Sequence, residues 1–242
     1  MLIIIINLNR NKERKEFMIN QFKKYPEVKY IFFDAVDGLK LSDEELQKNY
    51  DEKKSMHLIR RRLKNTEIAC SLSHKAVYEY IVQKAIKWAC VLEDDIVFSD
   101  DLFSVLDCIE NSMYQNTVIK LDQPPGYLSV KKHTKTLYDN YFLTHPYWNS
   151  VSTMGYCIDN KAASKLLRLN KKIFTVADHW DLYQQVINIR ALCPEIVRES
   201  TEFQSDIGNR VYIDTEKKQP KIIRKIVKRI RYLLALINYD IK

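Results

Sequence analysis

Three consecutive carboxylates, Glu93, Asp94 and Asp95, directly follow the apolar run at residues 88–92. Apolar runs of this length, preceded by a long helical pattern, are typical of buried parallel strands. The carboxyl ends of such strands are where α/β folds bind their ligands. Because adjacent anions repel one another, a compact fold tolerates them best beside water or a cation. A hard divalent ion takes carboxylate oxygens together with substrate phosphates, so the triplet indicates either a metal-and-phosphate site or a solvated acidic turn.

Hydrophobic periodicity, together with capping and turn residues, predicts the elements that position this triplet. These elements alternate between strand and helix. Expected strands are 2–7, 30–33, 88–92, 117–121, 155–158 and 192–198, with short strand candidates near 128–132 and 136–142. Expected helices are 12–24 after Asn11, a short one capped by Ser42 and Glu45, 67–87, 100–111, 161–169 and 175–189. Residues 50–65 are charged and predicted to be irregular. The pattern favours a single α/β domain with an irregular second half.

Glycine and cysteine usage excludes several site types. The four glycines, at 38, 126, 155 and 208, are too few and too scattered for a glycine-rich phosphate loop. Five cysteines without a Cys-x-x-Cys pair indicate neither a zinc site nor a disulfide framework, and fit reduced thiols in the cytosol. No stretch approaches the roughly 20 apolar residues of a membrane-spanning helix, and the apolar start ends too soon for a signal peptide.

The net charge of +8 belongs to the C-terminal tail. Residues 217–242 hold nine basic residues and one acid, whereas the preceding 216 residues are balanced. Apolar positions recur in this tail at helical spacing between lysines and arginines, which predicts a basic amphipathic helix suited to an anionic leaflet. The alternatives are a helix packed on the domain and a nucleic-acid site, but aromatic residues do not alternate with the cations as a nucleic-acid site would require.

Four short motifs occur in the order and approximate spacing of a known family. They are Ile5-Asn7-Leu8 with Arg10 and Arg14, then Phe33-Asp34-Ala35-Val36-Asp37-Gly38, then residues 67–74, which end in Ser73-His74, and finally Leu92-Glu93-Asp94-Asp95. On these motifs the chain resembles glycosyltransferase family 25, which includes bacterial lipooligosaccharide galactosyltransferases and relatives of the collagen galactosyltransferases. The resemblance covers residues 2–100 well and continues more weakly to about 210 through Gly155-Tyr156, Asp178 and Ser205-Asp206-Ile207.

Two local departures from the family pattern occur at the long helix. Ala69 stands where the family usually has glycine, and Asn65-Thr66 replace its usual Pro-Gly entry. Both are backbone changes that bear on loop shape rather than on chemistry. The second half diverges more, which leaves the acceptor undefined.

The resemblance implies a Rossmann-like, nucleotide-sugar-binding domain of the GT-A type over residues 1–216, followed by the tail at 217–242. It also implies an inverting transfer from a UDP-sugar, commonly UDP-galactose, with a divalent metal that is usually manganese (Mn²⁺, with Mg²⁺ as the other candidate). The implied acceptor is a lipooligosaccharide or lipopolysaccharide sugar. With the tail, this predicts a peripheral enzyme on the inner face of the cytoplasmic membrane.

The resemblance also suggests roles for individual residues around the donor. Asp95 is the expected metal ligand; Glu93 contacts the ribose or a metal-bound water, and Asp94 binds the metal or stabilises the loop. Arg10 and Arg14 are candidates for the diphosphate, although Arg14 also fits a solvated helix face beside Glu13 and Glu16. Further donor contacts are expected from Asn7, Asp34, Asp37 and His74. The competing interpretations are a closed turn for Asn7, an Asp-Gly turn for Asp37, and a structural histidine for His74, which shares one helix face with Glu67.

The catalytic base is expected downstream. Asp178 resembles the family's downstream acid and precedes Trp180, an aromatic neighbour suited to stacking on a sugar, with Asp181 as the second candidate. Thr175 and Asp178 also fit the Thr-x-x-Asp pattern of a helix start. Only geometry separates these possibilities, because a base must reach the acceptor hydroxyl.

The sequence therefore predicts a metal-dependent transferase that moves galactose, or glucose or an N-acetylhexosamine, from a UDP donor to a lipid-linked oligosaccharide. Two other classes remain open. One is a non-enzymatic membrane adaptor in which the triplet is a solvated turn, and the other is a phosphatase or phosphoacceptor domain with a phosphorylated strand-end aspartate.

Overall fold

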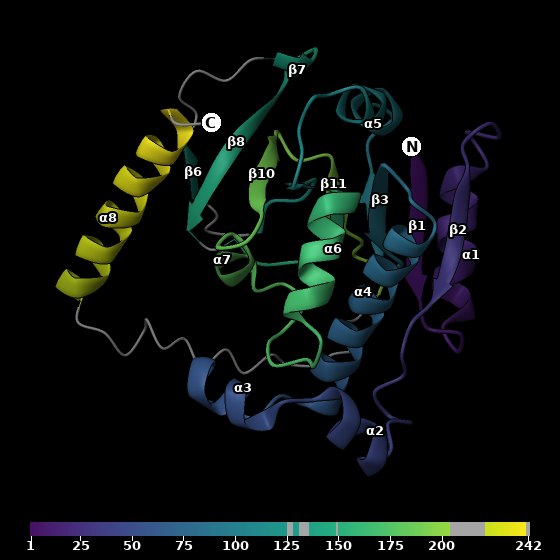
Figure 1. Cartoon of the computed structure of the whole chain (residues 1–242). Helices are drawn as coiled ribbons and strands as arrows, with labels where there is room; N and C mark the ends of the chain where they lie inside the picture. The colour runs from purple at the N-terminus through teal and green to yellow at the C-terminus, as the bar shows by residue number, and fades with distance from the viewer. Residues whose placement is uncertain (125–127, 131–135, 149, 204–220, 241–242) are drawn as a thin grey trace.

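The computed structural model describes residues 1–124, 128–130, 136–148, 150–203 and 221–240. Its fold is mixed α/β, with helices on both faces of a central sheet (Figure 1). The strands are β1 (Leu2–Asn7), β2 (Tyr30–Asp34), β3 (Trp88–Glu93), β4 (Ile96–Phe98), β5 (Thr117–Lys120), β6 (Leu128–Val130), β7 (Thr136–Tyr138), β8 (Tyr141–Trp148), β9 (Gly155–Asp159), β10 (Asn188–Cys193) and β11 (Val197–Glu199). The helices are α1 (Lys12–Phe22), α2 (Asp43–Asn49), α3 (Glu52–Leu58), α4 (Asn65–Gln83), α5 (Leu102–Glu110), α6 (Asn160–Leu169), α7 (Trp180–Tyr183) and α8 (Lys221–Asp240).

The main sheet has the strand order β2-β1-β3-β9-β5-β10-β8-β6, with β7 paired to β8. Strands β1, β2 and β3 are mutually parallel, and β9 runs antiparallel between β3 and β5. The carboxyl ends of β1, β2, β3 and β5 consequently meet at one edge of the sheet, together with the start of β9. This edge collects the polar residues that follow each strand.

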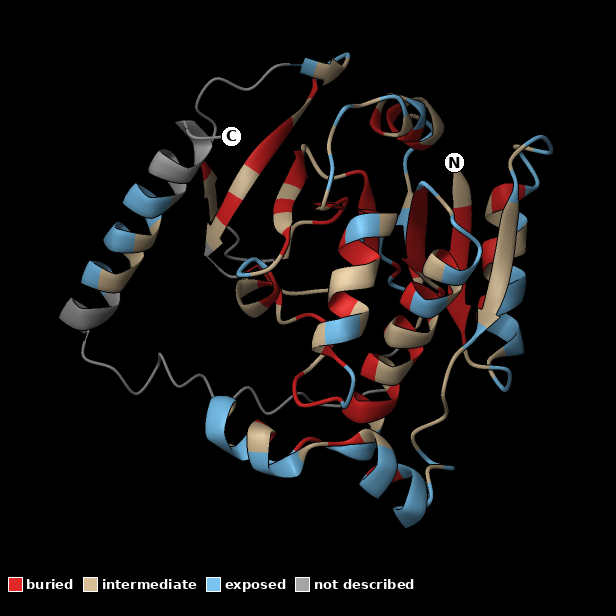
Figure 2. Ribbon diagram, viewed as in Figure 1, coloured by how far each residue is buried: buried red, intermediate tan, exposed pale blue. Residues whose placement is uncertain are grey.

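The isoleucine run of β1 shows why the first strand is central. Ile3 and Ile5 pack into the core on one face of the sheet, and Ile4 and Ile6 pack into the core on the other. Helices α1 and α5 cover the first face, whereas α4, α6 and α7 cover the second. Buried residues accordingly concentrate in the strands and on the sheet-facing sides of these helices (Figure 2). Two-sided burial matches the uninterrupted apolar sequence of a strand between two helical layers.

Several predicted elements form as expected. The strands β1, β2, β3, β5 and β9 and the helices α1, α4, α5 and α6 all occur within a few residues of their predicted bounds. Ser42 and Glu45 form the predicted capping box at the start of α2. Asn11 occupies the N-cap position of α1, but its side chain makes no capping hydrogen bond.

Three predictions are wrong. Residues 50–65 are not irregular throughout, because Asp51 accepts the Lys54 N–H and starts helix α3. The helix predicted at 175–189 is reduced to the four residues of α7, since the chain enters β10 at Asn188. The single strand predicted at 192–198 is divided between β10 and β11, which pair with different sheets. The predicted domain boundary at 216/217 lies outside the described residues.

Helix α8 lies against β8 and β6, at the opposite edge of the sheet from β2 (Figure 1). Arg231 on α8 forms an ion pair with Asp181 at 3.0 Å, and Tyr232 meets Tyr147 of β8 edge to face. Within the described residues, no helix combines the length and the apolar content that crossing a bilayer requires.

Candidate functional site

A pocket opens where the carboxyl ends of β1, β2 and β3 face the start of α4. Its apolar lining includes Leu8, Ala35, Val36 and Ala69. The same pocket is lined by the predicted polar residues Arg10, Arg14, His74, Glu93, Asp94 and Asp95. The sheet edge and the start of α4 thus bring together residues from all four sequence motifs, in a pocket lined by both apolar and charged side chains.

The part of the pocket lined by Gly38 and Thr66 depends on a close approach between two backbone segments. A Cβ atom added at Gly38 would lie 2.6 Å from the Thr66 Cα atom and 2.9 Å from the Asn65 carbonyl oxygen. The loop after β2 therefore reaches the first turn of α4 only because residue 38 has no side chain. This contact closes the pocket on the side that the Asp-Gly pattern marked as a turn.

The acidic triplet occupies the end of β3 and the turn into β4, and its three carboxylates have different environments. Asp94 is buried; it accepts hydrogen bonds from Asn7 Nδ2 at 2.6 Å and from Arg14 at 3.2 Å. Asp95 accepts a second bond from the same Arg14 nitrogen at 3.0 Å. Burial raises the pKa of Asp94, and Asn7 and Arg14 oppose that rise. Asn7 and Arg14 thus stabilise the turn that carries the triplet.

Asp95 is largely buried and lies near three further carboxylates, those of Glu93, Asp94 and Glu199. Burial, followed by repulsion from Glu93, raises the pKa of Asp95 to about 7, despite the attraction of Arg14. Deprotonation of Asp95 next to Glu93 is therefore costly without a further positive charge. A divalent cation at this point would supply it.

Glu93 connects the pocket to the interior of the domain. Its Oε1 accepts a hydrogen bond from Thr153 Oγ1 at 2.5 Å, and His74 Nε2 lies 3.9 Å from the same oxygen. His74 is buried, with Nδ1 2.7 Å from the hydroxyl of Tyr156. This arrangement fits the tautomer in which Nδ1 accepts from Tyr156 and Nε2 directs its proton toward Glu93.

The remaining predicted donor residues separate into two groups. Arg10 forms an ion pair with Asp37 at the pocket rim, and this contact lowers the pKa of Asp37 below its usual range. Asp37 is therefore more than an Asp-Gly turn residue. Asp34 is the last residue of β2, but it is exposed and does not line the pocket, so the structure does not group it with the others.

The interpretation of Arg14 as a solvated helix residue beside Glu13 and Glu16 is wrong. Its side chain is only 11% exposed, and its guanidinium bridges Asp94 and Asp95. The spacing along α1 cannot show this contact, because the two carboxylates are 80 and 81 residues away in sequence.

The two candidate bases lie in different surroundings, and neither lines the pocket at the carboxyl ends of β1–β3. Asp178 is buried, and its Oδ2 accepts the Ser152 N–H at 3.1 Å. Because Thr153 bonds to Glu93, the adjacent residues 152 and 153 link Asp178 to the acidic triplet. Asp181 instead pairs with Arg231 of α8 at 3.0 Å.

Sequence reasoning missed a buried ion pair at the carboxyl end of β5. Lys120 and Asp122 are both 0% exposed, and Lys120 Nζ lies 3.3 Å from Asp122 Oδ1. The available signal was a lysine and an aspartate inside an otherwise apolar run, 117–122, which was predicted only as extended.

The acidic turn fits a metal through two of its carboxylates rather than three. Among the described residues, no three His, Cys, Asp or Glu side chains converge in a metal-binding arrangement. All three carboxylates line the pocket, but Asp94 is the most buried of them and is bonded by both Asn7 and Arg14, whereas Glu93 and Asp95 are more exposed and repel each other. A cation held by two carboxylates keeps coordination positions for substrate phosphates.

Arg14→Met should destabilise the protein by about 3 kcal/mol, because it leaves two largely buried carboxylates without their cation. Arg10→Met is the matched control, since Arg10 is more exposed and its loss should cost less than about 1 kcal/mol. Urea unfolding of both variants at a common m-value measures the difference. Equal losses in the two variants would contradict the role assigned to Arg14.

His179, beside the two candidate bases, should make stability fall in acid. Burial lowers the pKa of His179 below 6.5, outweighing the attraction of Asp181 and Asp178. The unfolded chain then binds the proton more readily, so this contribution to stability is present above about pH 6.5 and lost as the pH falls below it. We expect the Tm difference between the wild type and His179→Gln to shrink on acidification between pH 8 and 5. A pH-independent difference would refute the assignment.

The sequence matches a known protein family over most of its length. Residues 1–180 match the model described as "Glycosyltransferase family 25 (LPS biosynthesis protein)". The chain belongs to glycosyltransferase family 25. The matched residues include those that line the pocket, with the acidic triplet, and Asp178.

Named relatives of this family 25 chain are distant and longer. Procollagen galactosyltransferase 2 of Homo sapiens is 28% identical over 183 residues, which are 69% of this chain and 27% of the relative. A putative glycosyltransferase of Acanthamoeba polyphaga mimivirus is 31% identical over 172 residues, 66% of this chain and 50% of the relative. The chain thus spans about a quarter of the human protein and half of the viral one.

A solved structure with a loosely similar shape is that of a mannose-1-phosphate geranyltransferase from Thermus thermophilus. It shares 8% sequence identity, covers 81% of this chain and 75% of its own, and has a TM-score of 0.41. That overlap is too loose to bear on the site.

Proposed function

We propose that this family 25 protein is an inverting galactosyltransferase that transfers galactose from UDP-galactose, with a β linkage, to a saccharide acceptor. The observation that carries the proposal is the pocket at the carboxyl edge of β1–β3, whose lining combines apolar residues with Glu93, Asp95 and two arginines. Family membership supports the reaction class, and the human relative carries galactosyltransferase in its name. The crevice at the carboxyl ends of strands is the general ligand site of α/β sheets.

In this proposal the uracil ring lies against the apolar residues that line the pocket, and the diphosphate lies toward the acidic triplet. Glu93 and Asp95 would hold a divalent cation, Mn²⁺ or Mg²⁺, which would neutralise the charge that grows on the leaving diphosphate. Arg14 holds the turn in place through Asp94, and Arg10 lies at the rim within reach of phosphate oxygens. A hydrogen bond from Thr153 orients Glu93, and His74 Nε2 lies 3.9 Å from the same carboxylate oxygen.

Asp178 is the better candidate for the base that takes the proton of the acceptor hydroxyl. The segment that bonds Asp178 also bonds Glu93, so Asp178 lies on the triplet side of the molecule. Asp181 is engaged by Arg231 and faces α8. A base must lie within hydrogen-bond reach of its proton, and this condition favours Asp178.

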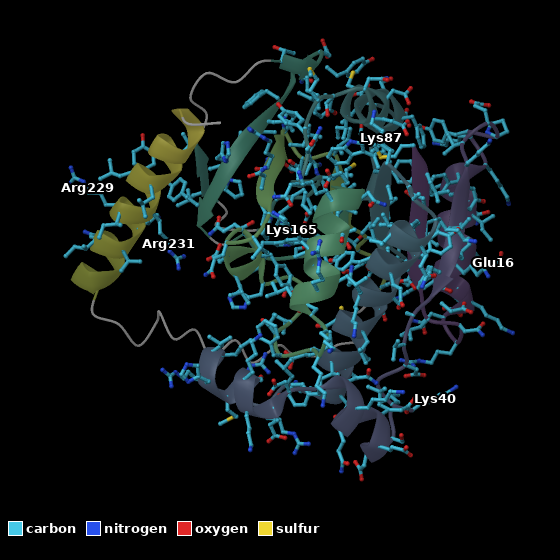
Figure 3. All side chains as sticks on the ribbon, in the orientation of Figure 1. Glu16, Lys40, Lys87, Lys165, Arg229 and Arg231 are labelled. Atoms are coloured by element: carbon cyan, nitrogen blue, oxygen red, sulfur yellow. The ribbon has the colours of Figure 1, made fainter. Side chains whose placement is uncertain are left out.

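A membrane-bound acceptor fits the two faces of α8. Ile226, Ile230 and Leu233 share one helix face and are 53%, 51% and 49% exposed. Arg231 lies on the side toward the domain, and Arg229 lies on the opposite side (Figure 3). The helix can therefore remain docked on β8 while its apolar stripe enters an anionic leaflet, each nearby cation adding about 1 kcal/mol.

The acceptor that suits this arrangement is a lipid-linked oligosaccharide such as a lipooligosaccharide. An enzyme held at the membrane meets such a substrate in two dimensions. We therefore propose a peripheral position on the inner face of the cytoplasmic membrane.

The test is a donor screen with the purified full-length chain. UDP release from UDP-galactose, UDP-glucose and UDP-N-acetylhexosamines is measured with Mn²⁺ and with a chelator, using a deacylated lipooligosaccharide as soluble acceptor. The proposal expects acceptor-dependent release, fastest with UDP-galactose and lost on chelation. Faster turnover with another UDP-sugar would change the donor assignment, and binding to vesicles without any UDP-sugar turnover would favour an adaptor.

A further inference from the structure

The ion pair between Lys120 and Asp122 lies in the middle of the molecule. Strand β5, which ends at Lys120, is hydrogen-bonded to β9 on one side and β10 on the other. Both side chains are 0% exposed, and Asp178 is the further carboxylate whose charge acts on Lys120. The pair is therefore beyond the reach of bulk solvent, although it lies at the same sheet edge as the donor pocket.

Burying this ion pair carries a large desolvation cost. Burial lowers the pKa of Lys120 and raises the pKa of Asp122, each opposed mainly by the other charge. Buried ion pairs of this kind often add no net stability over apolar side chains of similar volume. We therefore look for the role of the pair in the contacts that it makes.

Those contacts lead to residues 151–153, just before β9. Lys120 Nζ donates to the Val151 carbonyl oxygen at 2.5 Å. Ser152 has a φ of 77°, a left-handed conformation that a residue with a side chain adopts only when its surroundings enforce it. Its N–H donates to Asp178, and its carbonyl oxygen accepts from Trp180 Nε1 at 2.7 Å.

The next residue completes the connection, because Thr153 Oγ1 donates to Glu93 Oε1 at 2.5 Å. Three consecutive residues thus contact, in order, the buried ammonium, the proposed base and the carboxylate on the donor side. A shift of the Val151 carbonyl would move both of the other contacts with it.

We propose that Lys120 and Asp122 form a positioning pair that fixes residues 151–153 and thereby sets Asp178 relative to Glu93. This inference rests on the proposed transferase function for its kinetic consequence, but its structural consequence is independent of that function. The pair touches neither donor nor acceptor; it acts through the backbone of 151–153. Its loss should impair the transfer step while leaving donor binding nearly intact.

The test compares Lys120→Met, Asp122→Leu and the double variant. Each single variant leaves one buried charge unpaired and should lower Tm, whereas the double variant should recover the Tm of the wild type or exceed it. Despite that recovery, the double variant should lose about 100-fold in kcat, since small misplacements of reacting groups have effects of this size. Its KM for the UDP-sugar should change by less than about 3-fold, because the donor contacts remain.

Hydrogen exchange gives the second readout, and it needs no turnover. Amides 151–153 should exchange faster in the double variant than in the wild type. Val105→Ala is the control: Val105 is buried in α5, whose last residue, Glu110, pairs with the N-terminus at the amino end of β1. It should lower Tm without changing the exchange of 151–153.

The outcomes separate the two proposals. A double variant with wild-type kcat and wild-type exchange of 151–153 overturns the positioning role. Faster exchange of 151–153 in a protein whose wild type shows no transfer supports the positioning role and counts against the transferase. If the double variant does not fold, Thr153→Val removes the last contact of the segment and should reproduce the kcat loss; an unchanged kcat would then refute the proposal.

Discussion

Asp95→Ala should lower kcat for UDP-sugar turnover by roughly 10²–10³-fold while the protein stays folded. Asp95 lines the donor pocket, and repulsion from Glu93 contributes to raising its pKa to about 7. Removing its charge relieves that repulsion, and Arg14 keeps Asp94 as a partner. The variant should therefore lose the cation-dependent neutralisation of the leaving diphosphate without losing stability.

The measurement is UDP release at saturating Mn²⁺, with Tm recorded for the same preparations. Asp107→Ala is a suitable control, because Asp107 is an exposed carboxylate on α5 outside the donor pocket and should change neither quantity. Full turnover of Asp95→Ala at saturating Mn²⁺ would remove Asp95 from the metal site.

The double variant Ile230→Ser and Leu233→Ser should bind anionic vesicles roughly 10- to 100-fold more weakly than the wild type. Both side chains are about half exposed, whereas Arg231 and Tyr232 contact the domain. Full burial of such a side chain in an apolar phase contributes about 1.5–3 kcal/mol, and the half that is exposed about half as much. The loss of two therefore corresponds to about 1.5–3 kcal/mol, or roughly one to two powers of ten in the binding constant.

Vesicle sedimentation against lipid concentration measures this effect, and turnover on a soluble acceptor should stay at the wild-type level. Met113→Ser is the matched control, since Met113 is 96% exposed but lies outside α8. Deleting 217–242 is a less specific experiment, because α8 also covers β8 and pairs with Asp181. Unchanged vesicle binding of the double variant would show that the exposed stripe does not enter the bilayer.

The sequence predicted the central strands well because their burial is two-sided. Residues Ile3 to Ile6 and the run before Glu93 are continuously apolar, and both form strands between helical layers. The same reasoning placed the acidic triplet at the carboxyl end of β3. Location at a strand end is a local property, so it can be read from neighbouring residues.

The second half was less predictable because tertiary contacts override its local signals. Thr175 and Asp178 fit a helix start, but Thr175 bonds His179 and Asp178 bonds the backbone of Ser152. The buried residues Trp180 and Tyr183 then form only one helical turn, α7. Their apolar spacing resembles a helix face, yet it serves packing against the sheet.

The partners within the site were also beyond sequence reasoning. Arg14 reaches Asp94 across 80 residues, and Lys120 reaches Val151 across 31. No periodic pattern encodes such distances, since they depend on which strands become neighbours. Residue types marked the candidates, but the strand order β1-β3-β9-β5 determined which of them meet.

We propose that the pocket at the carboxyl edge of β1–β3 binds a UDP-sugar together with a divalent cation. Calorimetric titration of UDP into the full-length wild type, with and without Mn²⁺, tests it most directly, with Asp95→Ala measured in parallel. Ligand present at 100 times its Kd should also stabilise the fold by about 2.7 kcal/mol. We expect Mn²⁺ to strengthen UDP binding in the wild type but not in Asp95→Ala. No UDP binding, or equal strengthening by Mn²⁺ in both proteins, would contradict it.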